Sequence, residues 1–586
     1  MNSRWLVNKT NPEYVRYLSH AASVSPIFAQ VLINRGLKTA SDVSDFLYPN
    51  ITSLSDPFEL PSMKAAVARV KTALHRGERI LVHGDYDADG LTATAIMIQT
   101  LRTIGFDAHY FIPNRMLHGY GFHVPAVDMA KKLGAKLIIT VDCGVTSFEA
   151  VSYANKAGID VIITDHHEPL TNQRSEVRGQ RSEKADTYDF LLPEAIAVVN
   201  PKLGSCSLRL SNLSGAGVAF KFAEALAMEG GVPYSKDDVL PLLDLAALGT
   251  LADVVPLTGE NRIIVKEGLK LVHAGQRQGL RALKVVSGLN GKETGAGRLS
   301  FTLVPRINAA GRIADARDVV ELLLTDNEEE SLRLSSWLDS LNSERQKIEG
   351  EVYQEAIEKL RGKDTSSAIV LAGEGWHQGV LGIVASRLAE EFYRPAFIFS
   401  VEDNIAKGSA RSVPSFDIHK GLTETGELLL SFGGHKQAAG IKLKVEDMPA
   451  FEKAIQGIFQ SCVETSDLQP VLEIDANIRL SDVAHELVEE FALLGPFGMG
   501  NTEPLLGSKA LEVVSPKIVG NKHLKMRLKK ASLSLDAIGF GMGGLLEGLR
   551  NSPVVDAVFT PAINDWNGGR YLQLVVKAVR PGRESE

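Results

Sequence analysis

The chain has 586 residues, of which 44% are apolar and 23% charged, and its formal net charge is −8. At about 100–200 residues per domain this length predicts several domains, and the composition excludes a wholly disordered or fibrous protein. The acidic balance argues against a nucleic-acid partner, because Lys and Arg bind phosphates, unless metal ions neutralise the acidic residues and the basic ones cluster elsewhere.

Nothing in the sequence predicts export or insertion into a membrane. It has no run of about 18 uncharged apolar residues, and its start, MNSRWLVNKTNPEY, lacks the apolar stretch of a secretory signal. The three cysteines, Cys143, Cys206 and Cys462, have neither disulfide nor zinc-site spacing. We therefore expect a cytoplasmic protein without membrane contact and with reduced thiols.

The first half of the chain predicts an α/β domain. Residues 1–60 are expected to form an N-terminal segment that packs on the core. From residue 80 to 253, the short apolar runs RILVHG, AHYFIP, KLIITV, DVIIT and AIAVVNP alternate with helical stretches. This alternation is typical of a parallel sheet covered on both faces. We assign residues 61–325 to this domain and interpret the polar segment 171–189 as a loop with no core role.

The second half predicts three further elements. Residues 326–363 have helical spacing without proline, which indicates a long connecting helix. Residues 364–464 combine short apolar runs with helical patterns and form a smaller α/β domain. From residue 465 to 586 the short alternating runs indicate a small β-barrel. The predicted fold class is therefore α/β, with two α/β domains joined by a helix and followed by a barrel.

Acidic and histidine side chains follow the predicted strands. They are Asp85, Asp87 and Asp89 after RILVHG, Asp142 after KLIITV, Asp165, His166 and His167 after DVIIT, and Asp253 at the end of an apolar helix. Ligands of parallel α/β sheets bind at the carboxyl ends of the strands, so one edge would gather these side chains. Such a set suits Mg²⁺ or Mn²⁺. A pair of ions about 3.5–4 Å apart needs a bridging carboxylate, and we choose Asp142.

Simpler interpretations exist for each of these residues. Asp87 or Asp89 would also serve as the N-cap of the following helix. His166 alone would more often be a hydrogen-bonded core histidine, and Asp253 alone an acidic helix end. Cys143, next to Asp142, is better interpreted as a packing residue than as a nucleophile. Three acidic strand ends together favour the metal site.

The motifs resemble those of a known superfamily. HGDYDADG, VDCG, DHHE and LADVVPL are similar to successive motifs of the DHH phosphoesterases, and RINAAGR at 306–312 and GGHKQAAG at 433–440 are similar to those of the RecJ family of single-strand-specific exonucleases. The resemblance runs from FAQVLINRG to PFGMGN, essentially the whole chain. It implies a DHH domain, a smaller DHHA1 domain and a C-terminal OB-fold.

The resemblance also implies a ligand set for two Mn²⁺ or Mg²⁺ ions. The ligands would be Asp87, Asp89, Asp142, His166 and Asp253, with Asp142 as the bridge, and Asp85 and His83 as further candidates. We expect His167 to hold the scissile phosphate or its developing charge.

Basic residues predict where a strand would be held. Glycines beside Arg411 and His435 indicate a phosphate cradle, although they would also serve tight turns. By resemblance, the terminal nucleotides are gripped in an interdomain cleft by Arg306, Asn308, Arg312, Arg411, Ser412, Gly434 and His435. The run NKHLKMRLKK places Lys522, Lys525 and Arg527 on one strand, either as a solubilising edge or, as we prefer, as a track for a single-stranded backbone. The aromatic residues Phe497, Trp566 and Tyr571 would stack bases or fill the barrel.

These patterns predict a metal-dependent exonuclease that degrades single-stranded DNA to mononucleotides. The 5′-to-3′ direction, the DNA preference, and roles in recombination and mismatch repair are implied only by the resemblance. The same holds for single-strand-binding protein and a RecQ-type helicase as partners. Two alternatives stay open: a DHH-family phosphodiesterase for short oligonucleotides or cyclic dinucleotides, and a catalytically silent replication scaffold.

Overall fold

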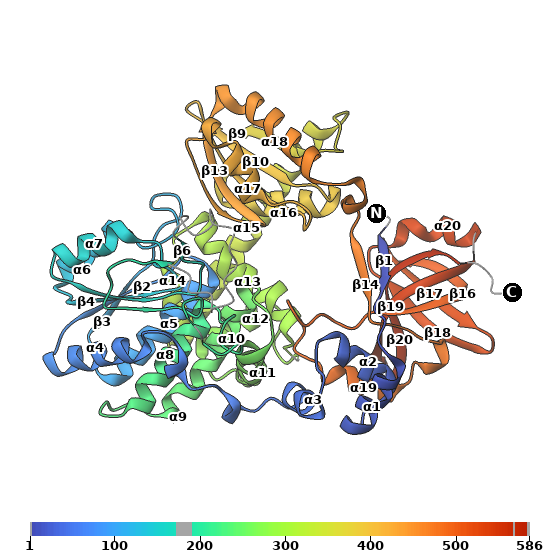
Figure 1. Ribbon diagram of the computed structural model, residues 1–586, viewed down its shortest axis with the longest axis horizontal. Coiled ribbons are helices and arrows are strands. Elements are labelled where there is room, and N and C mark those ends of the chain that lie inside the picture. Colours follow the sequence, from blue (N-terminus) through green and yellow to red (C-terminus); the bar gives the residue numbers. More distant parts are fainter. Residues whose placement is uncertain are drawn as a thin grey trace, which may run out of the picture. The chain divides into compact units, whose positions relative to one another are not determined.

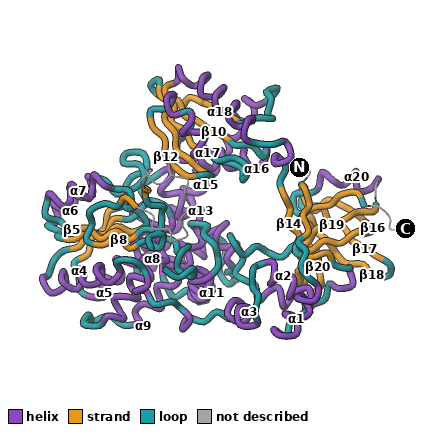
Figure 2. Tube along the Cα trace, viewed as in Figure 1, coloured by secondary structure: helices purple, strands orange, loops and turns teal. Residues whose placement is uncertain are grey.

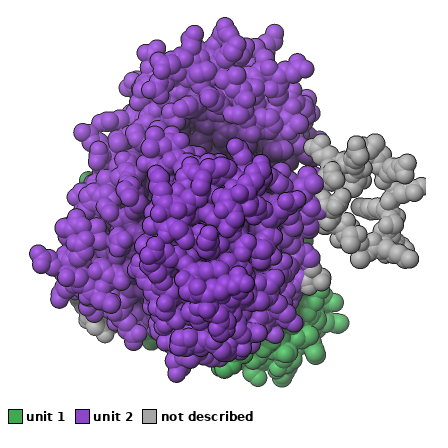
Figure 3. Space-filling model, turned by 90° about the vertical axis from the view of Figure 1, so that its left-hand side faces the viewer, with its two compact units in different colours: residues 1–53, 470–586 green, residues 54–469 purple. Residues whose placement is uncertain are grey.

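The computed structural model describes residues 3–171, 190–204, 206–292, 294–551, 553–566 and 569–582. The chain forms two compact units: unit 1 comprises Met1–Ser53 and Pro470–Glu586, and unit 2 comprises Leu54–Gln469 (Figure 3). Apart from Thr171, the polar segment 171–189 lies outside the described residues. No described helix is long and apolar enough to cross a lipid bilayer.

The larger α/β domain of unit 2 is built on a five-stranded parallel sheet (Figure 1). Its order is β3-β2-β4-β5-β8, with β2 at Ile80–His83, β3 at Ala108–Phe111, β4 at Leu137–Val141, β5 at Asp160–Thr164 and β8 at Ala197–Val199. All five strands were predicted. The β2 and β4 strands are buried along their whole length, as expected for a sheet covered on both faces.

Helices cover both faces of this sheet (Figure 1). On one face α6 (Val124–Leu133) and α7 (Phe148–Lys156) share a core with Leu81, Ile138 and Val161 of the strands. The α5 helix (Ala88–Ile104) and α8 (Gly215–Glu229) also contact the sheet and pack against each other and α10 (Leu243–Ala252). The other helices are α4 (Met63–Arg76), α9 (Lys236–Val239), α11 (Gly259–Ala274), α12 (Gln278–Val286), α13 (Ala296–Ile313) and α14 (Arg317–Leu324).

The predicted connecting helix is present as α15, which spans Glu328–Leu360 and packs against α12 and α13. It leads to the smaller α/β domain, whose sheet has the order β12-β13-β11-β10-β9. Its elements are β9 (Ile369–Glu374), α16 (Gln378–Phe392), β10 (Ala396–Glu402), β11 (Ile405–Arg411), α17 (Ile418–Glu424), β12 (Ser431–His435), β13 (Ala438–Lys444) and α18 (Met448–Cys462).

Unit 1 contains the predicted barrel. Its strands are β16 (Leu506–Val519), β17 (His523–Lys530), β18 (Leu533–Gly539), β20 (Gly569–Pro581) and β19 (Val554–Trp566), in that order, and β19 closes the barrel by pairing with β16. Figure 2 shows these strands beside α1 (Pro12–Ala22) and α2 (Pro26–Asn34). The α19 helix (His485–Ala492) contacts α2 and β19. The unit also contains two short elements, β15 (Ala476–Asn477) and α20 (Leu546–Asn551).

The N-terminal segment packs on the core of the barrel unit. Leu18, Phe28 and Val43 of α1, α2 and α3 (Ala40–Leu47) belong to the same hydrophobic cluster as Phe491 and residues of the barrel. The β1 strand (Arg4–Val7) pairs in parallel with β14 (Val471–Ile474). The expected segment 1–60 is therefore divided, because Met1–Ser53 belongs to unit 1 and the residues from Leu54 belong to unit 2.

A buried ion network fixes the start of unit 2 to α8. The Lys221 side chain is fully buried, and its Nζ lies 2.5 Å from Glu224 Oε2 and 3.5 Å from Glu260 Oε2. It also donates a hydrogen bond to the Ser55 carbonyl at 2.6 Å, while the Ser55 amide donates to Glu260 Oε1 at 2.7 Å. Loss of Lys221 would leave the equally buried Glu260 carboxylate without its countercharge.

We expect Lys221→Met to lower the free energy of unfolding of unit 2 by about 3–5 kcal/mol, because it breaks a buried ion pair from one side. Urea unfolding followed by circular dichroism measures the change. The control is Lys270→Met, since Lys270 pairs with Glu267 on the surface and should contribute about 0–1 kcal/mol. Equal effects of the two substitutions would contradict the structural role of Lys221.

Candidate functional site

The turn between β2 and α5, together with the first turn of α5, presents three aspartates, Asp85, Asp87 and Asp89. Asp87 is the N-cap of α5, because its Oδ1 accepts hydrogen bonds from the Asp89 and Gly90 amides at 3.0 and 3.1 Å. The capping interpretation is thus correct for Asp87, yet a cap uses only one of its two oxygens. The Asp85 carboxylate is buried in the same turn, and its Oδ1 has no hydrogen-bond partner.

The start of α8 brings Asp89 and Asp142 together. The amides of Gly215 and Ala216 donate to the two oxygens of Asp89 at 2.6 and 3.0 Å. Asp142 directly follows β4 and has a positive φ of 62°. Its carboxylate lies so close to α8 that a Cβ on Gly215 would be 2.4 Å from Asp142 Oδ1. The absence of a side chain at Gly215 therefore makes room for the carboxylate.

His166 lies at the centre of three carboxylates. Its Nε2 is 3.1 Å from Asp142 Oδ1, 3.5 Å from Asp253 Oδ2 and 3.9 Å from Asp89 Oδ2. The Nε2 atom and these oxygens of Asp142 and Asp253 are buried without a hydrogen-bond partner. Adjacent ligands of an octahedral ion with bonds of about 2.1 Å lie roughly 3 Å apart, so this spacing fits a shared cation.

The described residues form three overlapping groups of possible ligands. In each group the ligand atoms lie within 4.8 Å of one another, and the groups are Asp85, Asp87 and Asp142; Asp142, His166 and His167; and Asp89, His166 and Asp253. Asp142 and His166 each belong to two groups, and of these two only the Asp142 carboxylate has two oxygens with which to bridge a pair of ions.

His83 belongs to none of these groups among the residues that the structure describes. Its ring is buried between Phe111 and Phe122, and its Nε2 lies 3.1 Å from the Gly121 carbonyl oxygen. Burial lowers the pKa of His83 to about 3, so the ring is neutral and its Nε2–H donates to that carbonyl. The other ring nitrogen, Nδ1, is buried without a hydrogen-bond partner, so His83 holds the loop at Gly121 and stays a candidate metal ligand through Nδ1.

The electrostatics of the site favour a bound cation. Burial, followed by repulsion from the neighbouring carboxylates, raises the pKa of Asp142 and Asp85 well above the usual value. The same causes raise the pKa of Asp89 to about 7 and that of Asp253 to about 9. Ionised carboxylates in this position require positive charge, which one or two hard divalent ions supply. The donor set of oxygens and imidazole nitrogens fits Mn²⁺ or Mg²⁺.

Asp165 orients the two histidines that follow it. Its Oδ1 accepts from the amides of His166 and His167 and lies 2.8 Å from His167 Nδ1, while Oδ2 accepts from the Val145 amide. Burial opposes the charged form of His167, but the hydrogen bond to Asp165 prevails and raises the pKa of His167 to about 9. The exposed fraction of this side chain is 41%, so a cationic donor faces solvent beside the acidic groups.

Three arginines form a second cluster of opposite charge, to which we refer as the arginine cluster. Arg115 lies in the loop after β3, Arg312 near the end of α13 and Arg411 at the end of β11 in the smaller α/β domain. Burial, and then repulsion from Arg115 and other arginines, lowers the pKa of Arg312 to about 10; the pKa of Arg411 is lowered by burial and by Arg115.

The arginine cluster fits an anion that is shared by the two domains. Among the ion pairs of the described residues none involves Arg115, Arg312 or Arg411, and Arg115 Nε is buried without a partner. A phosphate would supply the missing negative charge. Sequence reasoning missed Arg115 because it considered only acidic and histidine residues at strand ends, although Asn114 and Arg115 directly follow the predicted strand AHYFIP.

Three other residues predicted to line the cleft, Arg306, Asn308 and Ser412, form hydrogen bonds within the protein. The Arg306 guanidinium lies 2.8 Å from Asp339 and donates to the Thr302 carbonyl, and the Ser412 hydroxyl donates to the Phe416 carbonyl at 2.7 Å. Asn308 Oδ1 accepts from the Ala88 amide at 2.8 Å. These side-chain atoms therefore have partners within unit 2.

The hairpin of β12 and β13 brings His435 near the site. Gly434 has a φ of 142°, and a Cβ there would be 2.3 Å from the Ala438 carbonyl, so the hairpin requires glycine. Burial, then the charges of Arg411 and His167, lowers the pKa of His435. His435 thus lies within electrostatic range of both the arginine cluster and the DHHE turn.

In unit 1 the outward face of β17 is basic. The side chains alternate, with Leu524, Met526 and Leu528 buried and Lys525 and Arg527 at least partly exposed. Arg527 pairs with Asp536 at 3.5 Å, whereas no described acidic residue pairs with Lys522 or Lys525.

The three aromatic residues that were predicted to stack bases or fill the barrel differ in exposure. Tyr571 is 59% exposed, Phe497 packs on the core, and the Trp566 side chain lies outside the described residues.

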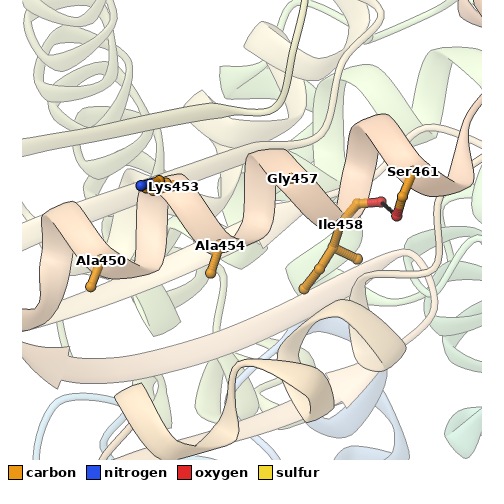
Figure 4. Close-up of a pocket in the computed structure, with 6 residues that line it drawn as sticks. All are labelled: Ala450, Lys453, Ala454, Gly457, Ile458 and Ser461. Atoms are coloured by element: carbon orange, nitrogen blue, oxygen red, sulfur yellow. Dashed lines mark hydrogen bonds between the residues drawn. The ribbon is translucent and has the colours of Figure 1, made fainter.

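A hollow on the outer side of α18 is unrelated to these clusters (Figure 4). All of its lining residues belong to this one helix, and Ser461 merely donates to the Ile458 carbonyl of the preceding turn. The lining residues are Ala450, Lys453, Ala454, Gly457, Ile458 and Ser461. Nothing in this surface suggests a ligand.

Comparisons with known proteins agree with this architecture. The DHH family N-terminal domain matches residues 79–250, the DHHA1 domain 343–461 and the RecJ OB domain 474–578. The chain is 39% identical over 581 residues to the single-stranded-DNA-specific exonuclease RecJ of Bacillus subtilis (strain 168), covering 98% of this chain and 70% of that protein.

Two solved structures of RecJ from Thermus thermophilus are similar over nearly the whole chain. The complex with Mn²⁺ has a TM-score of 0.83 and 32% identity, and it covers 100% of this chain and 80% of the other. The complex with Mg²⁺ has a TM-score of 0.76 and 30% identity, and it covers 99% and 79%.

We expect Gly215→Ala to weaken Mn²⁺ binding by about 10–100-fold, the range for residues that support metal ligands, because the added methyl group displaces Asp142. The backbone amide of residue 215 still donates its hydrogen bond to Asp89 in this variant. Mn²⁺ titration followed by electron paramagnetic resonance measures the affinity. The control is Gly457→Ala, where a Cβ has no neighbour within 4 Å. Unchanged affinity in Gly215→Ala would contradict the placement of Asp142.

Proposed function

The chain belongs to the RecJ family of single-stranded-DNA-specific exonucleases, and we propose that it is a metal-dependent exonuclease that removes mononucleotides from single-stranded DNA in the 5′-to-3′ direction. One observation carries this proposal: ligand groups that share Asp142 lie in the same unit as an arginine cluster with no acidic partner. The first fits divalent ions, and the second fits a phosphate of the strand.

The metal ligands we propose are Asp87, Asp89, Asp142, His166 and Asp253, with Asp85 and His83 as further candidates. Mn²⁺ or Mg²⁺ bound there supplies a nucleophilic water at neutral pH and stabilises negative charge on the reacting oxygens. No serine or cysteine nucleophile is then needed, which agrees with the burial of Cys143 and the raised pKa of its thiol.

The protein's own side chains hold the DNA in this proposal. His167 carries a proton near neutral pH, as its raised pKa indicates, and donates to the scissile phosphate. Arg115, Arg312 and Arg411 bind the phosphate at the strand's end, so cleavage occurs at a fixed distance from that end. A terminal phosphate held in this way explains both exonuclease action and release of single nucleotides.

The barrel supports a longer substrate than a dinucleotide. Lys522, Lys525 and the exposed ring of Tyr571 suit contact with a single-stranded backbone and its bases. A dinucleotide phosphodiesterase would have no use for this surface. We further propose, from the family resemblance, a cytoplasmic location, roles in recombination and mismatch repair, and single-strand-binding protein and a RecQ-type helicase as partners.

We expect purified protein with Mn²⁺ or Mg²⁺ to release labelled mononucleotides from single-stranded oligonucleotides that have a free 5′ end. A blocked 5′ end or a blunt duplex should be resistant. Asp142→Asn should reduce the rate by at least about 1,000-fold, since it removes the shared ligand, while binding to the strand persists in a gel-shift assay. Release from the 3′ end would overturn the direction, and normal cleavage by Asp142→Asn would overturn the metal site.

We expect Arg115→Ala to raise KM for a 5′-phosphorylated strand by about 10–100-fold, the value of one lost charge-assisted hydrogen bond. A strand with a 5′ hydroxyl should be affected much less. Steady-state kinetics on both strands measures the difference. The control is Arg333→Ala, because Arg333 lies on the surface and pairs with Glu330. An equal loss on both strands would show that Arg115 does not bind the terminal phosphate.

A further inference from the structure

Asn308 contacts the metal-ligand turn, although the sequence predicted that it contacts DNA. It lies on α13, and its Oδ1 accepts a hydrogen bond from the Ala88 amide at 2.8 Å. Ala88 is the first residue of α5 and stands between Asp87 and Asp89, two of the proposed ligands. The side-chain oxygen of Asn308 therefore binds the backbone at the point from which both carboxylates project.

The next turn of α13 contacts the same loop through the backbone. A Cβ on Gly311 would lie 2.1 Å from the Tyr86 carbonyl oxygen, so the helix can approach this closely only with glycine at that position. Asn308 and Gly311 are three residues apart and hence on the same face of the helix. Together they contact Ala88 and Tyr86, the residues on either side of Asp87.

The end of α13 also contacts the smaller α/β domain. Arg312 Nη1 donates a hydrogen bond to the Gly379 carbonyl at 3.2 Å, in the first turn of α16. Residues Asn308–Arg312 thus lie between the metal-ligand turn on one side and α16 on the other. The side chains of Asn308 and Arg312 therefore connect the larger α/β domain, which holds the metal-ligand turn, with the smaller one, which contains α16.

We propose that Asn308 is a positioning residue, which holds the Ala88 amide and thereby sets Asp87 and Asp89 at metal-binding distance. It acts through its side-chain oxygen and not by donating its amide hydrogens to DNA. The last turn of α13 then joins the metal centre to the smaller α/β domain, so that the two halves of unit 2 are aligned by the same helix. This inference rests on the proposed metal site. The experiment below distinguishes a wrong role for Asn308 from a wrong metal site.

The test measures Mn²⁺ affinity by isothermal titration calorimetry and, separately, single-stranded DNA affinity without metal. Asn308→Ala should bind Mn²⁺ about 10–100-fold more weakly, in the range for residues that orient metal ligands. Asn308→Asp keeps an oxygen acceptor for the Ala88 amide but has no amide hydrogens to donate. It should bind Mn²⁺ within about threefold of the wild-type protein or more tightly, because its charge adds to the acidic site.

The control on the same helix is Phe301→Ala, since the Phe301 side chain is 87% exposed; it should change neither affinity. Circular dichroism establishes that each variant is folded, and if Asn308→Ala is not, Asn308→Asp decides alone. Mn²⁺ affinity reduced tenfold or more in Asn308→Asp overturns the inference. So does wild-type Mn²⁺ affinity in Asn308→Ala with weakened DNA binding, the result that direct phosphate contact predicts. A wild-type protein that binds no Mn²⁺ would instead overturn the proposed function.

Discussion

Buried carboxylates at one end of a parallel sheet are the constraint on which the rest of unit 2 depends. They gather because β2, β4 and β5 run in the same direction and end at the same edge. Two amides at the start of α8 stabilise Asp89, as helix N-termini favour negative charge. They do not compensate for burial, since the pKa of Asp89 is still raised to about 7. Only a cation can make the ionised site favourable.

The arginine cluster presents the same problem with the opposite sign. Burial, and then repulsion from the neighbouring guanidinium groups, lowers the pKa of Arg312, and no carboxylate of the described residues forms an ion pair with it. Stability alone would favour apolar side chains at these positions over guanidinium groups that no carboxylate pairs with. Unpaired charges in both clusters make folding of unit 2 less favourable. Such an arrangement is expected of a binding site in which metal ions pair with the carboxylates and a phosphate pairs with the arginines.

The sequence predicted the sheet and its acidic edge well because both follow from local patterns. Fully buried strands are continuous apolar runs, and the residue after each run is at the strand's end by necessity. Side-chain direction does not follow from such patterns. Arg306 and Asn308 belong to one motif and are two residues apart, yet Arg306 pairs with Asp339 and Asn308 binds the Ala88 amide. Helix packing between remote segments decides this, as it also decides that residues 1–53 join the barrel unit.

The net charge of −8 is compatible with a nucleic-acid substrate once the charges are placed in the fold. The acidic residues of the centre count toward that total, although bound divalent ions would neutralise them. Of the basic residues, Arg312 and Arg411 have no acidic partner among the described residues, whereas Arg527 on the barrel is paired with Asp536. Binding of a strand depends on this local imbalance and not on the sum over the chain. An unpaired arginine near a metal centre is therefore more informative about the substrate than the overall charge.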